Sequence, residues 1–334
     1  MSPRGPDPDA SGREAAGGGE PPRDEDGWIG AIARRFPPGP RVRVGLGHDA
    51  AVVAFDGRDV VLKTDTVIDG VDFRLAACGA RAAARKALAV TVSDLAAMAA
   101  LPRACVVSAV LPRGIDFATF DALAAGFEDG ARETDCEVVG GDTSVADAPL
   151  VLTVAAIGEP GPHGVVTRAG ARPGMDLSVT GPLGGSILGR HLTFAPRVRE
   201  AQVLAALGVP AAMMDLSDGL STDLPRLAAR SGVGAEVDAE ALPVHPDVAR
   251  LADGVAPWRH ALDDGEDFEL LLAHAPLSAA TRAALAAADV TLHRVGRVTA
   301  AAGGVTLREG GRTVPLRRGG FDHLRSHPAG PTGG

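Results

Sequence analysis

The stretch MMDLSDGLSTDL, from Met213 to Leu224, contains three carboxylates and no cation. Apolar residues stand on both sides of Asp215, Asp218 and Asp223. An ionised carboxylate in a dry setting is costly unless an opposite charge or hydrogen bonds compensate it. A distant arginine, water or a bound metal ion must therefore neutralise this part of the chain.

More single aspartates stand beside a strand end or an apolar run: Asp49, Asp65, Asp94 and Asp142. Asp94 is the most informative of them. On a helix, Val90, Leu95 and Met98 would surround it with an apolar surface, so a lone carboxylate there needs a reason.

Taken alone, each aspartate has a structural explanation. Asp218 or Ser217 could cap a helix, and Asp142 or Asp49 could stabilise a glycine turn. Taken together, the six carboxylates Asp49, Asp65, Asp94, Asp142, Asp215 and Asp218 favour a shared site. Mg²⁺ prefers oxygen ligands and is usually held by one or two carboxylates plus substrate phosphates. Zinc fits poorly, because the nine histidines are isolated and no CxxC occurs.

None of the common phosphate loops is present. GLGHDA, residues 45–50, matches a dinucleotide fingerprint, but the β-branched Val52 and Val53 follow where a helix should open. GPLGGSILG lacks the lysine of a P-loop, and DLSDGLSTDL lacks the glutamate that closes a calcium loop. A nucleotide bound here would need another device, and metal ions on carboxylates would provide one.

The composition excludes several classes of protein. The formal charge of −9 argues against nucleic-acid binding, and no apolar run approaches the ~20 residues of a membrane span. Cys78, Cys105 and Cys136 are an odd number, which predicts free thiols and a cytoplasmic location. Lysine occurs only at Lys63 and Lys86, a scarcity that we attribute to a GC-rich genome.

Chain length suggests about two domains. We expect a disordered tail over residues 1–26, a first domain over 27–160, a second over 161–325 and a flexible end over 326–334. Helical periodicity predicts one or two helices between residue 79 and Pro102, and CEVVGGDTS reads as a strand entering a glycine turn. Strands and helices do not alternate strictly, so the pattern favours an α+β fold with mixed sheets.

Nine motifs spread over about residues 27–325 carry a resemblance: GLGHDAAVV, KTDTVIDGVDF, RKALAVTVSDLAAMAALP, VVGGDTS, TRAGARPGMDLSVTG, MMDLSDGLSTDL, DDGEDFELLL, GRVT and GFDHL. In this order they resemble the thiamine-monophosphate kinase family of the PurM-like superfamily. That resemblance implies a two-domain PurM-like fold, with mixed β-sheets flanked by helices. It also implies phosphoryl transfer from ATP to thiamine monophosphate, the last step of thiamine diphosphate biosynthesis, with several Mg²⁺ ions and a homodimer.

The resemblance further implies site residues. The implied magnesium ligands are Asp49, Thr64, Asp65, Asp94, Asp142, Asp215 and Asp218. The implied ATP contacts are Gly141, Asp142, Arg168 and Ser217. The implied substrate contacts are Asp72, Glu266 and Phe321. No general base is expected, because a phosphate acceptor is already largely ionised near neutral pH.

Three residues depart from the family pattern. His48 stands where aspartate is common, Lys63 where a hydroxyl can face the metal, and Asp72 where a histidine often contacts substrate. The ammonium of Lys63 cannot ligate a cation. These departures keep open a second reading, a catalytically idle nucleotide- or metal-binding regulator. A third reading, a selenophosphate synthetase-like enzyme, needs a Cys or selenocysteine and a Lys near the N-terminus, and residues 1–40 contain neither Cys nor Lys.

Overall fold

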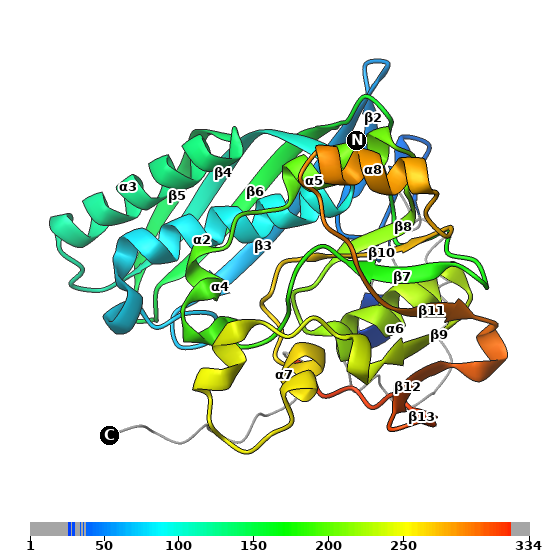
Figure 1. Ribbon diagram of the computed structural model, residues 1–334. Coiled ribbons are helices and arrows are strands. Elements are labelled where there is room, and N and C mark those ends of the chain that lie inside the picture. The colour runs from blue at the N-terminus through cyan, green and yellow to red at the C-terminus, as the bar shows by residue number, and fades with distance from the viewer. Residues whose placement is uncertain (1–25, 28, 31–33, 35, 37, 322–334) are drawn as a thin grey trace, which may run out of the picture.

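The computed structural model describes residues 26–27, 29–30, 34, 36 and 38–321. It contains two mixed β-sheets with helices packed against them (Figure 1). The predicted disordered start lies outside the described residues except for Asp26, and so does the predicted flexible end. No helix in the described ranges combines the length and apolar character that a membrane span requires.

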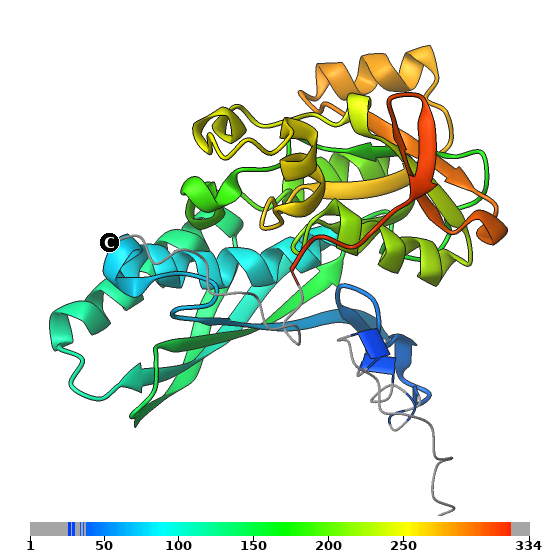
Figure 2. The same ribbon diagram turned by 90° about the horizontal axis from the view of Figure 1, so that it is seen from below.

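The first sheet has the strand order β1-β2-β3-β6-β4-β5. Its strands are β1 Val42–Val44, β2 Ala51–Phe55, β3 Arg58–Ile68, β4 Ala100–Pro112, β5 Glu137–Ala146 and β6 Val151–Pro160. All neighbours pair antiparallel except β4 and β5, which are parallel. Helices α2 Leu75–Ala97 and α3 Phe117–Thr134 lie side by side on one face (Figure 2).

The second sheet has the order β13-β12-β9-β11-β7-β10-β8. Its strands are β7 Asp176–Val179, β8 Pro210–Asp215, β9 Gly234–Asp238, β10 Leu270–His274, β11 His293–Thr299, β12 Val305–Glu309 and β13 Arg312–Pro315. The longer helices beside it are α5 Val198–Ala206, α6 Leu220–Ser231, α7 Pro257–Asp263 and α8 Ala279–Ala287. Short helices are α4 Arg190–Thr193, η1 Ser186–Leu188, η2 Ala239–Ala241, η3 Pro246–Arg250 and η4 Ala301–Gly303.

Helix α2 connects the two halves. Its middle packs on the first sheet, where Leu88, Val92 and Leu95 are fully buried. Its C-terminal end contributes Ala97 to a second cluster that includes Met213 of β8. A helix packed between two sheets has little exposed surface, which explains why its apolar residues are not confined to one stripe. Asp94 lies on this connecting segment.

Two predicted boundaries are wrong. The predicted helix ends at Ala97, not at Pro102, because Ala99 takes a left-handed backbone (φ 52°) and strand β4 begins at Ala100. Pro102 is tolerated in that strand beside a bulge, where the ladder is interrupted. A short apolar run does not by itself distinguish a buried strand from a buried helix.

The predicted glycine turn is also absent, because Gly140 and Gly141 lie inside strand β5. A Cβ atom on Gly141 would lie 2.0 Å from the carbonyl oxygen of Val107 on β4. The glycine therefore permits close approach of two backbones rather than a change of direction.

Candidate active site

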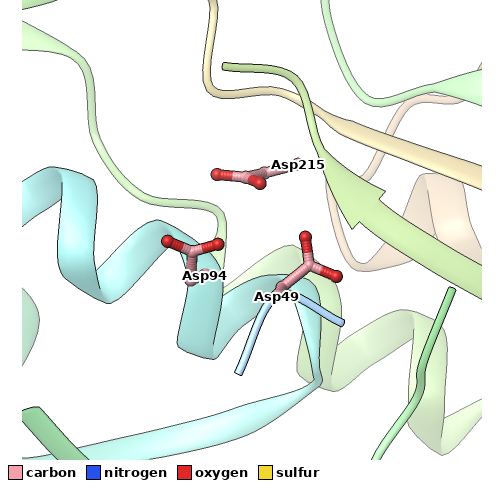
Figure 3. A group of neighbouring side chains, drawn as sticks. All are labelled: Asp49, Asp94 and Asp215. Atoms are coloured by element: carbon pink, nitrogen blue, oxygen red, sulfur yellow. The ribbon is translucent and has the colours of Figure 1, made fainter. Parts of the chain in front are cut away.

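Three predicted ligands meet at the junction of the two sheets. Asp49 precedes β2, Asp94 lies near the end of α2, and Asp215 is the last residue of β8. Each offers a carboxylate oxygen, and these oxygens all lie within 4.8 Å of one another (Figure 3). Residues separated by more than 160 positions along the chain thus share one point in space.

All three carboxylates are buried, with 2% exposure for Asp49, 7% for Asp94 and 3% for Asp215. Burial raises the pKa of Asp94 well above its usual range. It also raises the pKa of Asp215 to about 7, and the neighbouring Asp49 adds to this rise although Ser93 donates a 2.6 Å hydrogen bond. Burial thus disfavours the ionised forms of these carboxylates more than the nearby positive charges favour them.

Two basic side chains compensate part of this charge. Arg168 donates two hydrogen bonds to Asp49, at 3.0 and 2.8 Å. The ammonium of Lys63 lies 2.8 Å from Asp94 and 3.1 Å from Asp65. The second oxygen of Asp65 is buried and has no hydrogen-bond partner in the described part of the chain. The three clustered carboxylates fit a divalent cation with oxygen ligands, and the oxygen of Asp65 is a further hard donor on the cavity wall.

A cavity of about 1080 Å³ opens beside the cluster and is lined by both halves of the chain. Predicted site residues on its wall are Asp65, Asp72, Asp94, Arg168, Asp215, Ser217, Asp218, Glu266 and Phe321. His48 also lines it, and burial together with Arg230 lowers the pKa of His48, so its ring is neutral at pH 7. The volume is at the upper limit of what is typical for small-molecule sites.

A buried lysine that sequence reasoning did not select organises the opposite wall. The ammonium of Lys86 lies 2.8 and 2.6 Å from the two carboxylate oxygens of Glu266 and also donates to the carbonyl of Asp72. Burial raises the pKa of Glu266, and Lys86 opposes that rise. The sequence did offer one signal, because lysine occurs only at Lys63 and Lys86. In the structure both lysines contact carboxylates of the predicted site.

The rest of the opening stretch is neutralised by an arginine. Asp218 and the fully buried Asp223 both pair with Arg226 of α6. Asp26, at the start of the described chain, accepts a 3.1 Å hydrogen bond from the same guanidinium. Helix α6 is not capped by Ser217 or Asp218 as one explanation held, because its cap residue is Gly219.

Backbone hydrogen bonds and backbone conformation position the predicted substrate residues. The carboxylate of Asp72 accepts a 2.8 Å hydrogen bond from the Ile68 amide and so closes the turn after β3. Phe321 donates its amide to the carbonyl of Asp218 at 3.0 Å. Glu266 has a left-handed backbone (φ 53°), which is costly for a non-glycine residue and is typical of functional loops.

Three predicted site residues, Thr64, Gly141 and Asp142, belong neither to the cluster nor to the cavity wall of this chain. The hydroxyl of Thr64 donates to the Val154 carbonyl at 3.1 Å. Gly141 and Asp142 are exposed on edge strand β5, and two strands separate them from Asp65 on β3. Strands lie about 4.8 Å apart, so the gap is roughly 14 Å. Their assignment as ligands or ATP contacts stays a prediction.

Two backbone amides of the glycine-rich loop at residues 181–189 donate to carboxylates. Gly184 donates to Asp267 at 3.0 Å, and Gly185 donates to Asp264 at 2.7 Å. Amides that already donate to aspartates are not available to phosphate. The structure therefore agrees with the sequence argument that this segment is not a phosphate loop.

Comparison with known proteins identifies the family to which this fold and site belong. The N-terminal domain model of AIR synthase related proteins matches residues 47–159, and the C-terminal domain model matches residues 152–308. Thiamine-monophosphate kinase of Rhodopirellula baltica is 38% identical over 277 residues, covering 79% of this chain and 86% of that protein. The same enzyme of Halobacterium salinarum is 38% identical over 274 residues, covering 78% and 90% respectively.

Solved structures agree in fold. The structure of AaThiL complexed with AMPPCP and TMP superposes with a TM-score of 0.77 at 28% identity, covering 90% of this chain and 97% of that one. A hydrogenase maturation protein, HypE in complex with ATP, matches with a TM-score of 0.64 at 22% identity, which shows the fold alone.

Fold and site together define a protein of the AIR synthase related, PurM-like class, as the sequence predicted. Within that class, the chain belongs to the thiamine-monophosphate kinase family. It is accordingly an enzyme, an ATP-dependent phosphotransferase.

Proposed function

We propose that this enzyme transfers the γ-phosphoryl group of ATP directly to the phosphate of thiamine monophosphate and so forms thiamine diphosphate. The observation that carries the proposal is the buried trio Asp49, Asp94 and Asp215 beside a cavity lined by both halves. Relatives at 38% identity are thiamine-monophosphate kinases, and a structural neighbour was solved with AMPPCP and TMP.

Magnesium is the cation that best suits this site. The donors are hard carboxylate oxygens, and the unpartnered oxygen of Asp65 adds another. When bound, Mg²⁺ would screen the repulsion between two phosphorylated molecules. Asp49, Asp94 and Asp215 would hold it, with Asp65 nearby, and we propose several ions once ATP is present.

The chain's own residues would then bind the two substrates and align their phosphates. The acceptor phosphate needs no general base, so the protein must place two phosphates in line and keep water away. Lys86 fixes Glu266 on the cavity wall, and we propose that this carboxylate faces the thiazolium cation of the substrate. Asp72 and Phe321 line the same cavity and would complete that side.

We further propose a cytoplasmic homodimer formed through the open face of the first sheet. That face carries partly exposed apolar side chains, including Leu62, Val106 and Ile157, which are 40–45% exposed. A second copy packed there would bury them. It would also offer its own Gly141 and Asp142, which lie roughly 14 Å from Asp65 within one chain.

A coupled assay of ADP release tests the proposal. The full chain, given ATP and thiamine monophosphate, should release ADP with Mg²⁺ and stop when the metal is chelated. Unphosphorylated thiamine serves as the matched acceptor control and should give no signal above the ATP-only background. Nucleotide binding without turnover would instead favour the idle regulator.

A further inference from the structure

Lysine is so rare in this chain that the places where it occurs are informative about the site. Of 33 basic residues only Lys63 and Lys86 are lysines, and arginine supplies the charge everywhere else. Arginine presents a broad planar fork, whereas lysine presents a compact ammonium on a flexible stem. A chain that uses arginine almost throughout keeps lysine where a point charge fits and a guanidinium does not.

Lys63 is held at one such point. It precedes Asp65 by two positions on β3, so both side chains leave the same face of the strand, toward α2. Its ammonium lies 3.1 Å from Asp65 and 2.8 Å from Asp94, and all three side chains are at most 21% exposed. Lysine is ordinarily a cation at neutral pH. Two carboxylate contacts hold that positive charge at this point.

An ammonium between two carboxylates occupies the place of a bridging cation. Mg²⁺ would need to lie about 2.1 Å from an oxygen of each carboxylate, and it cannot share that space with the Lys63 ammonium. Charge balance points the same way. The four carboxylates Asp49, Asp65, Asp94 and Asp215, less the charges of Lys63 and Arg168, leave two negative charges. One divalent ion compensates that remainder.

We infer that Lys63 is a built-in cation that replaces one divalent ion between Asp65 and Asp94. The substrate-free chain then binds a single divalent ion, at Asp49, Asp94 and Asp215. This inference rests on the proposed metal site but not on turnover. Lys63 also lines the cavity, so its charge faces the phosphates that enter there.

Counting bound Mn²⁺ in the full chain, without nucleotide, tests the inference. Free Mn²⁺ is followed by electron paramagnetic resonance during titration of the wild type and of Lys63→Thr, which provides a neutral hydroxyl. We expect one equivalent per chain for the wild type and two for Lys63→Thr. Arg43→Thr, which removes an exposed cation from β1, is the matched control and should stay at one equivalent.

Two equivalents in the wild type, or equal counts in the wild type and a folded Lys63→Thr, would overturn the inference. Lys63→Met keeps the aliphatic stem, should also bind two equivalents, and replaces the threonine variant if that one does not fold. If neither variant folds, the number of Mn²⁺ equivalents bound by the wild type alone tests the inference. No Mn²⁺ binding by any variant would overturn the proposed metal site itself, whereas normal binding without turnover would reject only the proposed reaction.

Discussion

At the residue scale, several carboxylates of the site can be recognised in the sequence. The basic side chains that pair with them cannot. Asp94 could be singled out because a carboxylate among apolar neighbours needs compensation. Lys86 and Arg226 could not be assigned in advance, because their partnerships depend on where remote segments lie. Lys86 contacts Glu266, which is 180 positions away. Sequence spacing does not reveal such a pair.

The raised pKa values predict how magnesium stabilises the protein. Burial raises the pKa of Asp94, and raises that of Asp215 to about 7. In the metal-free protein these groups keep protons that the unfolded chain releases above pH ~4. The folded state therefore loses stability as pH rises from about 4 to 7. Mg²⁺ needs the ionised carboxylates, so its stabilising effect grows over that range.

Thermal unfolding at two pH values measures this effect. Saturating Mg²⁺ should raise Tm by only about 1 °C at pH 5 and by roughly 5 °C or more at pH 8. Na⁺ at matched ionic strength should give no such difference. An Mg²⁺-induced shift of equal size at both pH values would show that these carboxylates do not hold the ion.

At the element scale, strands and long helices follow from periodicity, but two boundaries do not. The helix–strand junction at Ala99 is set by packing between two sheets, which a single-sequence pattern does not reveal. Gly140 and Gly141 read as a turn because glycine is common in turns. In the structure only Gly141 is sterically required, since it faces the Val107 carbonyl across β4 and β5.

Paired alanine substitutions separate these two glycines. Gly141→Ala should destabilise the protein by about 1–3 kcal/mol, because its Cβ would overlap the Val107 oxygen. Gly140→Ala is the matched control, since nothing lies within 4 Å of its Cβ, and it should change stability by less than ~0.5 kcal/mol. Denaturant unfolding gives both values. Equal effects of the two substitutions would contradict the close approach of β5 to β4.

At the scale of the whole molecule, one chain brings together only part of the predicted ligand set. The cluster and the cavity contain most predicted residues, whereas Asp142 lies on the far edge of the first sheet. No sequence pattern states whether a ligand acts within its own chain or in a partner. In the proposed homodimer, mixing variants of the two subunits can test whether Asp142 acts in its own chain or in the partner.

Mixing two inactive variants distinguishes these cases. If Asp142 serves the partner's site, a heterodimer of Asp94→Asn and Asp142→Asn retains one site with both aspartates. Unfolding and refolding an equal mixture should then restore about a quarter of wild-type turnover, because half of the dimers are mixed and each has one intact site. Each variant refolded alone should stay inactive. No recovery in a mixture that contains heterodimers would place Asp142 outside the partner's site.

The central claim is that buried aspartates hold the cations through which ATP phosphorylates thiamine monophosphate. Chromatographic measurement of thiamine diphosphate formed by the wild type, Asp94→Asn and Asp147→Asn tests it most directly. Asp147 is an exposed aspartate paired with Arg113, and its substitution should leave turnover unchanged. Asp94→Asn should remain folded and lose at least about a hundredfold in turnover. Near-normal product formation by a folded Asp94→Asn would contradict the account.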